Sequence, residues 1–226
     1  MSSSDKNSKT VRYIKLMIGI FLCGLGVTMV INSNAGASSW DIFHMGLTGI
    51  LKMPIGKASI VAGFVVIILN IVLGQTIGPG TILNIYFIGT ITDIIRNLNI
   101  IPVSNNIFFK IIILLLGMII YSYGTFLYMS QGKGCGPRDG LMQVLSKKTN
   151  ISVAIVKNSI EIIVLIMGIF LGGKSLIGIG TLIYALSIGF IISFMFKIHK
   201  VEVKTIEHTS LKEEFHEIVH FFTNKK

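Results

Sequence analysis

Charged side chains are the residue class in which this sequence is poorest. Only 13% of its 226 residues are Asp, Glu, Lys or Arg, whereas 52% are hydrophobic. Soluble domains carry about 25% charged residues, because a surface that faces water needs them. The composition therefore excludes an ordinary soluble domain and indicates a membrane protein.

Acidic residues are scarcest in the middle of the chain. Between positions 11 and 197 there are only four of them: Asp41, Asp93, Asp139 and Glu161. The net charge of +10 comes from basic residues at the ends of apolar runs, as the positive-inside rule expects, and not from a basic patch with interleaved aromatics. We expect the lipid bilayer as a partner and no nucleic acid.

Cysteine is also rare, and this scarcity limits the metal and disulfide chemistry that the chain can support. Cys23 and Cys135 are the only two cysteines, they have no metal-ligand spacing, and one pair supports no disulfide framework. The sequence has no phosphate-binding loop, no Gly-x-Ser-x-Gly motif and no cluster of His, Cys or acidic residues inside the apolar runs. We therefore expect no metal, no cofactor, no catalytic residue and no enzyme activity.

Apolar runs of membrane-spanning length dominate what is present. A span needs about 20 residues. Runs close to this length lie at 13–33, 55–74, 81–97, 107–130, 153–172 and 176–197, and two shorter runs, 40–51 and 139–146, follow glycine-rich loops.

The chain matches itself at an offset of 98 positions. This offset pairs Gly36 with Gly134 and Asp41 with Asp139, and a two-residue shift later aligns two Gly-x-Gly-Thr turns. The sequence thus predicts an all-α polytopic membrane protein of two tandem repeats, each with three long spans and one short broken or re-entrant helix. The expected divisions are a cytoplasmic N-terminus, repeat 1, a linker, repeat 2 and a cytoplasmic tail, at 1–12, 13–98, 99–106, 107–197 and 198–226.

The number of crossings stays open between six and eight. If the short segments do not cross, there are six spans and the halves are inverted. If they do, there are eight and the halves are parallel. The distribution of Lys and Arg favours eight, whereas a helix of about 12 residues covers only about 18 Å and favours six. Both alternatives place the two termini in the cytoplasm.

Three short motifs carry a family resemblance. Asn-Ala-Gly-Ala-Ser-Ser-Trp40-Asp41, Gly134-Cys-Gly-Pro137-Arg138-Asp139-Gly140 and Gly178-Ile-Gly180-Thr181-Leu resemble the signature of the YczE/YyaS/YitT group of bacterial membrane proteins. The resemblance covers about residues 11–197. It implies a multi-pass protein of the bacterial cell membrane, with transport or export of small molecules as the function suggested for the group.

The paired glycine-rich loops are the first candidate site. Gly36 and Gly134 allow close backbone approach, and Asp41 and Asp139 stand where the N-caps of the short helices are expected. Discontinuous helices of this kind build substrate sites in many transporters, so we expect the loops 34–41 and 132–139 to approach each other. The alternative is that both aspartates only cap interfacial helices.

Glu161 is the second candidate, since it lies about ten residues into an apolar run. Lys157 is one helical turn earlier and could pair with it. An ionised side chain at this depth costs several kcal/mol unless it is partnered, so Glu161 is either a coupling-proton or cation site or half of a structural ion pair. Trp40, an interfacial anchor or a cavity wall, and Arg138 complete the binding candidates.

The tail contains a motif that is weighed and rejected. His216-Glu217-Ile218-Val219-His220 matches the His-Glu-x-x-His pattern of zinc proteases, but only six residues follow it and no cleft-forming domain is present. An amphipathic helix that begins with a capping box at Ser210 and Glu213 explains the segment better.

The combined expectation is a secondary transporter or exporter of a small organic solute. Internal duplication, broken helices and one deep acid recur in transporters. The alternative is a scaffold or regulator that acts through its cytoplasmic tail and moves nothing. A channel comes third.

The predicted topology is testable by cysteine labelling of intact cells. Single cysteines at Ser2, Lys148 and Asn224, introduced in place of the native pair, should stay unlabelled by an impermeant thiol reagent. Labelling at the first or last position would overturn the topology, and labelling at Lys148 alone would contradict both crossing numbers.

Overall fold

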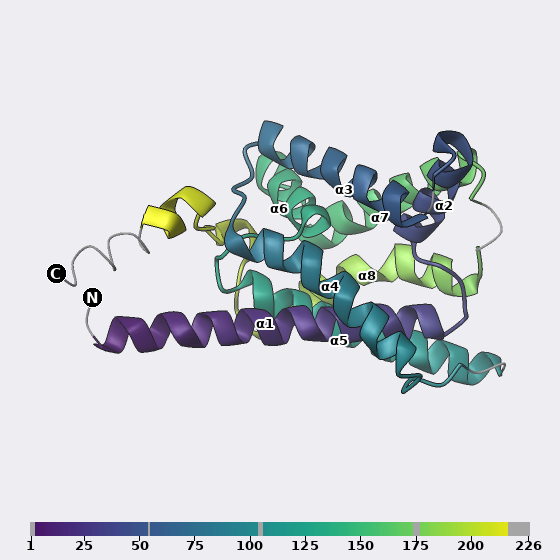
Figure 1. The fold of residues 1–226 in the computed structure, drawn as a ribbon, viewed down its shortest axis with the longest axis horizontal. Coiled ribbons are helices and arrows are strands. Elements are labelled where there is room, and N and C mark those ends of the chain that lie inside the picture. Colours follow the sequence, from purple (N-terminus) through teal and green to yellow (C-terminus); the bar gives the residue numbers. More distant parts are fainter. Residues whose placement is uncertain (1–2, 54, 104–105, 174–176, 217–226) are drawn as a thin grey trace.

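The chain folds into helices throughout the part that can be described. The computed structural model describes residues 3–53, 55–103, 106–173 and 177–216, which hold eight α-helices and no strand (Figure 1). The helices are α1 (Ser3–Asn32), α2 (Ser39–Leu51), α3 (Ile55–Val72), α4 (Pro79–Asn97), α5 (Ile107–Met129), α6 (Pro137–Thr149), α7 (Val153–Phe170) and α8 (Ile179–Ile198). The predicted all-α class is confirmed, and each apolar run lies on its own helix.

Four of these helices are long and apolar enough to cross a bilayer by length and composition. They are the Lys9–Asn32 part of α1, then α5, α7 and α8, while the Lys57–Val72 part of α3 is a shorter apolar helix. Large apolar side chains stay exposed on the outer faces: Phe170 is 85% exposed, Ile60 72% and Phe64 63%. No soluble fold would leave so many uncovered, so these faces contact lipid.

The short helices lie toward opposite ends of the bundle. The long helices run roughly along the longest axis, α2 lies at the right-hand end of the view and α6 toward the left (Figure 1). With 13 residues each, α2 and α6 are too short to cross alone.

Helices α1 and α5 cross closely and antiparallel. A Cβ on Gly19 would lie 2.6 Å from the backbone nitrogen of Tyr128, and a Cβ on Gly26 would lie 2.6 Å from that of Tyr121. Positions further along α1 therefore meet earlier positions on α5. Small residues allow this approach, and close packing, rather than a hydrophobic driving force, holds helices together in lipid.

The predicted approach of segments 34–41 and 132–139 is present at their C-terminal ends, where the Arg138 guanidinium lies 4.6 Å from the centroid of the Trp40 ring. The loop 132–136 lies beside the middle of α1, because a Cβ on Gly80 would touch both the Lys133 carbonyl oxygen and Leu16. The loop 33–38 instead follows the end of α1 at Asn32. Leu16 and Asn32 are sixteen residues apart on α1. At 1.5 Å per residue, the levels of the two loops along this helix differ by roughly 24 Å. The parts 33–38 and 132–136 therefore lie at different levels of the bundle, while the first turns of the short helices converge.

The described tail returns to the end at which α1 begins. After α8 it forms a 3-10 turn, η2 (Val203–Thr205), and becomes helical again over 211–216. The predicted capping box is present, since Ser210 N donates to Glu213 Oε2 at 2.7 Å and Glu213 N to Ser210 Oγ at 3.2 Å. The rest of the predicted amphipathic helix, and positions 217–220 of the His-Glu-x-x-His motif, lie outside the described residues.

The glycine crossing predicts a stability difference between two glycines. Gly26→Ala should destabilise the protein by about 1–3 kcal/mol, because the added methyl group must push α5 away. Gly63→Ala on α3 is the matched control, since nothing lies within 4 Å of its Cβ position. It should be neutral, or stabilising by up to about 1 kcal/mol. Thermal unfolding in detergent measures both, and equal melting temperatures would contradict the tight crossing.

Candidate functional site

The first turn of α2 corrects the predicted role of Asp41. The N-cap is Ser38, and Asp41 is the third helical residue. Its backbone N–H donates to Ser38 Oγ at 3.3 Å, and Ser38 Oγ donates to Asp41 Oδ2 at 2.7 Å. Asp41 therefore supports the cap from inside the first turn, where its charge still complements the helix N-terminus.

The first turn of α6 has the same register and a different chemistry. Gly136 is the N-cap, Pro137 opens the helix, and Asp139 is again the third residue rather than the predicted cap. Asp139 is 3% exposed, and its Oδ2 accepts a hydrogen bond from the Tyr128 hydroxyl at 2.5 Å. The same hydroxyl accepts from the Gly136 N–H at 3.2 Å. The carboxylate is thus held toward the interior by α5.

Lys157 bridges two buried carboxylates. Its Nζ lies 3.5 Å from Asp139 Oδ1 and 3.4 Å from Glu161 Oε1, and both Lys157 and Glu161 are 1% exposed. The i,i+4 contact expected on α7 is present, but Asp139 on α6 is an additional partner that the sequence did not reveal. Two carboxylates therefore share one ammonium group.

Glu161 keeps one oxygen free. Its Oε2 is buried and has no hydrogen-bond partner among the described residues. A buried charged oxygen without a partner is costly, and such groups in native proteins call for an explanation. The position can hold a proton or accept a hydrogen bond from a cationic group.

The first turns of α2 and α6 meet. The Arg138 guanidinium lies over the Trp40 ring, 4.6 Å from its centroid. Trp40 Nε1 and Ser39 Oγ, both on α2, are buried without a hydrogen-bond partner in the described part of the chain. Candidates from both halves therefore gather in one region.

Gly36 and Gly134 hold the loops rather than contact the charged groups. Both have positive φ, +139° and +102°. A Cβ on Gly36 would lie 2.6 Å from Thr181 Oγ1, and one on Gly134 would lie 2.7 Å from Thr81 Oγ1. Each loop is thus fitted against a Gly-x-Gly-Thr turn of the other half.

Backbone hydrogen bonds join these elements. Gly180 N donates to the Ala35 carbonyl at 2.9 Å, and Gly80 N donates to the Lys133 carbonyl at 2.6 Å. Thr181 Oγ1 also donates to the Ala37 carbonyl at 2.7 Å. Non-helical backbone inside a bundle needs such partners, because lipid supplies none.

Sequence reasoning missed Tyr128. This residue is fully buried in an apolar run, where an aromatic residue is expected for packing alone. Asn158 joins α7 to α8: its side-chain amide donates to the Leu186 carbonyl and accepts from Gly189 N, both at 2.7 Å.

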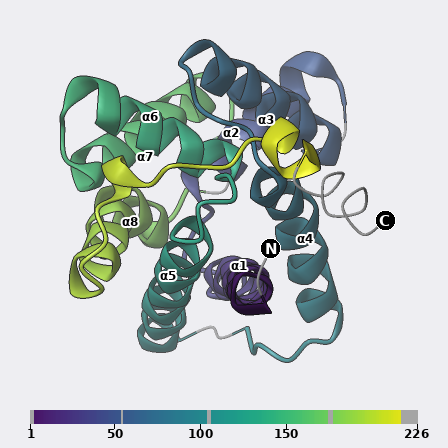
Figure 2. The ribbon, with the colours of Figure 1, turned by 90° about the vertical axis from the view of Figure 1, so that its left-hand side faces the viewer.

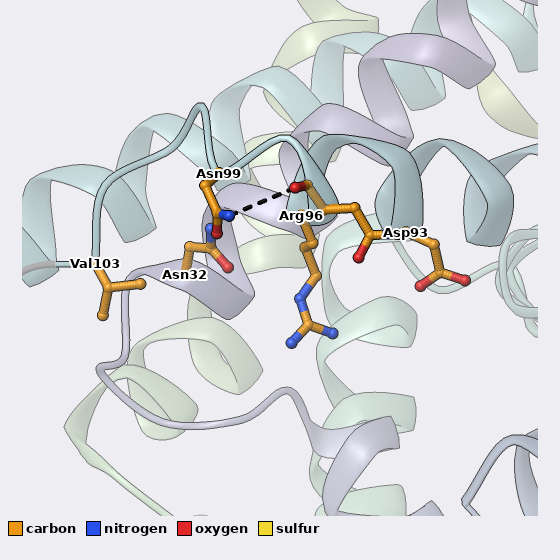
Figure 3. A pocket seen from close by; sticks show the side chains of 6 residues that line it. Asn32, Asp93, Arg96, Asn99 and Val103 are labelled. Carbon is orange, nitrogen blue, oxygen red and sulfur yellow. Dashed lines mark hydrogen bonds between the residues drawn. The ribbon is translucent and has the colours of Figure 1, made fainter.

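A polar pocket lies apart from this cluster. About 440 Å³ in volume, it is lined by Asn32, Asp93, Arg96, Asn97, Asn99 and Val103 at the C-terminal ends of α1 and α4 (Figure 3). Asp93 and Arg96 are exposed, and within the described ranges no ion pair joins them. The two side chains point apart (Figure 3).

Comparison with known proteins gives relatives along the membrane part. A family model described as "Family of unknown function (DUF6198)" matches residues 10–197. A Haemophilus influenzae protein titled "Uncharacterized protein" is 31% identical over 81% of this chain and 82% of its own length. "Uncharacterized membrane protein YczE" of Bacillus subtilis is 31% identical, over 84% of this chain and 87% of its own. "Uncharacterized protein YyaS" of the same organism is 25% identical over 76% and 86%. No solved structure matches the chain.

The shared ammonium predicts opposite effects for two neutralising substitutions. Lys157→Met leaves two buried carboxylates without a counter-charge and should destabilise the protein by about 3–5 kcal/mol. Glu161→Gln should keep or raise stability, because Lys157 still has Asp139 as a partner. Thermal unfolding in detergent tests both, with Lys148→Met at an exposed lysine as the control. A Glu161→Gln protein that melts well below wild type would contradict the bridging role.

Proposed function

The chain belongs to the DUF6198 family of bacterial membrane proteins of the YczE and YyaS type, and we propose that it is a secondary transporter or exporter of a small organic solute. In this proposal Asp139, Lys157 and Glu161 form the site, together with Arg138 and Trp40 at the meeting helix ends. No catalysed reaction is part of it.

The free oxygen of Glu161 carries the proposal. Inside a bundle, an ionisable residue with an unpartnered oxygen is a functional position by default. Lys157 can neutralise only one of the two carboxylates beside it, so the site has room for one more positive charge. A proton or the cationic group of a solute at Glu161 would supply that charge, and its arrival and departure would couple to opening of the site.

Inverted repeats would give such a site two routes of access. The proposal takes α1–α4 and α5–α8 as two units of opposite orientation, with six crossings and with α2 and α6 re-entrant. It is supported by the reciprocal contacts of equivalent glycines: Gly19 is equivalent to Gly117 but packs near Gly124, and Gly26 is equivalent to Gly124 but packs near Gly117. Transporters built this way place the site between the units and expose it alternately to the two sides.

The proposed orientation places the beginning of α1 and the tail on the cytoplasmic side of the bacterial cell membrane. Tyr13 and Glu214 are hydrogen-bonded at 2.7 Å, so these two segments share one end of the bundle. Lys204 Nζ donates to the Asn150 carbonyl at 3.0 Å, which brings the α6–α7 connection to the same end. Lys147 and Lys148 lie beside it, as the positive-inside rule favours for a cytoplasmic loop.

A scaffold or regulator that acts through its tail is the alternative. It needs a tail that is free for a partner, whereas residues 203–214 already make contacts with the membrane part. A transport assay separates the two functions directly.

The test is transport by purified protein in liposomes loaded with a pH-sensitive dye. Small organic cations, amines and amino acids are added outside under an imposed pH gradient, and proton movement is recorded. Wild type should move protons with at least one solute, and Glu161→Gln should fall to the level of empty liposomes at unchanged expression and melting temperature.

Asp93→Asn is the matched control for this loss. It neutralises an exposed acid at the end of α4, away from the cluster, and should transport as wild type does. Full activity of Glu161→Gln would overturn the role given to the free oxygen. Inactivity of wild type across the solute classes would favour the scaffold.

A further inference from the structure

The described tail crosses one end of the bundle as a strap. We define the strap as residues 201–214, which follow α8. Seen from the end at which α1 begins, the strap passes over α6 and on toward α3 and α4 (Figure 2). Thr209 N donates to the Gly132 carbonyl at 2.8 Å and Leu211 N to the Ile77 carbonyl at 3.1 Å. The strap thus bridges the loop before α6 and the turn before α4.

His208 anchors the middle of the strap. Its Nδ1 accepts a hydrogen bond from Gly134 N at 3.1 Å, so the ring carries its proton on Nε2. That nitrogen lies 2.8 Å from Gln143 Oε1, which accepts from it, and 2.9 Å from Cys135 Sγ. The ring therefore covers the loop directly in front of α6.

Both polar atoms of the Gln143 side chain are hydrogen-bonded, and its nitrogen binds the strap. Its Nε2 donates to the carbonyls of Val203 and Ile206 at 2.9 and 3.0 Å, and its Oε1 accepts from Gln75 at 2.8 Å. Gln143 lies one turn after Asp139 on α6. The same short helix therefore carries the strap on one turn and the site on the preceding one.

A buried ion pair fixes the far end of the strap. Lys133 Nζ lies 2.6 Å from Glu214 Oε2, with side chains 5% and 9% exposed, and the Tyr13 hydroxyl donates to Glu214 Oε1. Burial alone would raise the pKa of the Glu214 carboxyl, but hydrogen bonds from Lys133 and Tyr13 and nearby positive charges keep it below its ordinary value. The carboxylate is thus charged and held at neutral pH.

The two Gly-x-Gly-Thr turns differ in what lies against them. The atoms nearest to a Cβ on Gly178 belong to Ala35 and Gly36, whereas those nearest to a Cβ on the equivalent Gly78 belong to Lys133 and to Thr209 of the strap. The family match ends at residue 197, before the strap begins. The strap therefore lies outside the part of this chain that the family model matches.

We propose that the strap is an autoinhibitory closure: docked, it holds the loop 130–136 and the first turns of α4 and α6 together, and the Asp139–Lys157–Glu161 site opens to this end only when the strap undocks. The regulation rests on the proposed transport function. The docking of the strap and its release do not depend on the transport function, because both are measured without any solute.

Acid should favour release. Burial lowers the pKa of His208 to about 4, from an ordinary value of 6.5. A protonated ring would turn Nδ1 into a donor facing the Gly134 N–H. The other groups facing the ring are Cys135 and the neutral amides of Gln75 and Gln143, and the nearest ion pair in the strap is Lys133–Glu214. Docking is thus complete above pH 6.5 and weakens as the pH falls toward 4.

The size of the pH effect follows from the two pKa values. Between pH 7.5 and 5.5 the docking equilibrium should shift about tenfold toward release. His208→Gln should remove this dependence, since the amide stays neutral over the whole range.

The native cysteines report the strap in the full-length protein. Cys135 is 2% exposed beneath His208, while Cys23 is buried between α1 and α5. Protein in nanodiscs is treated with N-ethylmaleimide, digested, and read by mass spectrometry, with each rate divided by that of the denatured protein at the same pH. If the strap is released, N-ethylmaleimide should react with Cys135 alone, whereas global unfolding should expose both Cys135 and Cys23 to the reagent.

Glu214→Gln is the decisive variant and Glu213→Gln its control. The first removes the charge that pairs with Lys133, and the second changes the exposed neighbour that makes only the capping box. Glu214→Gln should raise the labelling rate of Cys135 about tenfold or more at pH 7.5 and leave Cys23 protected. Glu213→Gln should match wild type.

A second readout connects release to the site. A water-soluble carbodiimide with glycine methyl ester should amidate Asp139 faster in Glu214→Gln than in Glu213→Gln. Equal Cys135 rates in the two variants, or Cys23 labelled in parallel with Cys135, would overturn the strap as an independent closure. Faster Cys135 labelling with unchanged amidation of Asp139 would overturn its control of the site.

Discussion

Non-helical backbone inside the bundle must find its hydrogen-bond partners within the protein, because hydrocarbon offers none. The segments 33–38 and 130–136 are such backbone, and each is satisfied by the first turn of the last helix of the other half. Gly180 N donates to Ala35 and Gly80 N to Lys133. These bonds require backbone-to-backbone approach, which is why a Cβ on Gly78 or Gly178 would meet a carbonyl oxygen. The two halves are therefore interlocked, and the meeting of the short helices follows from that interlock.

Charge is the second constraint, and it depends on the first. Because α6 starts inside the bundle, Asp139 is carried to a depth where its charge needs a partner, and Lys157 on α7 supplies it. The same Lys157 is shared with Glu161, so the pairing is incomplete by one positive charge. A fully balanced pair would be only a structural device. The imbalance is the basis of the proposed exchange of a proton or cation at this cluster.

The helices could be predicted from the sequence because apolar runs of span length have few alternatives. The runs predicted at 55–74 and 107–130, for example, became Ile55–Val72 and Ile107–Met129. The contact between Lys157 and Glu161 followed from helical spacing alone. The N-caps could not be predicted in this way, because local dihedral angles decide which residue is the cap. Ser38 and Gly136 were as compatible with the sequence as the predicted Asp41 and Asp139.

Long-range partners lay beyond sequence reasoning for a different reason. The expected approach of the two loop segments is met only where Arg138 lies over Trp40, because an internal match fixes which segments are equivalent and not whether the units point the same way. The contact of Asp139 with Lys157 depends on the packing of α6 on α7, and no periodicity encodes it. The docking of His208 could not be foreseen either, since the tail lies outside the repeat and offers only a histidine among polar residues.

The predicted repeat makes the one-sidedness of the candidate chemistry visible. The positions equivalent to Tyr128, Lys157 and Glu161 in the first half are Val30, Ser59 and Gly63, so of the buried cluster only Asp139 has an acidic counterpart, Asp41. Asp41 in turn accepts a hydrogen bond from Ser38, the cap of its own helix. Both segments have glycines where the backbones meet, since a Cβ on Gly78 or Gly178 would meet a carbonyl oxygen. In the predicted repeat, one unit would then carry the charged groups while the other supports the geometry. The strap docks on the loop before α6, the short helix that carries Asp139, which is why the proposed closure is placed at that end.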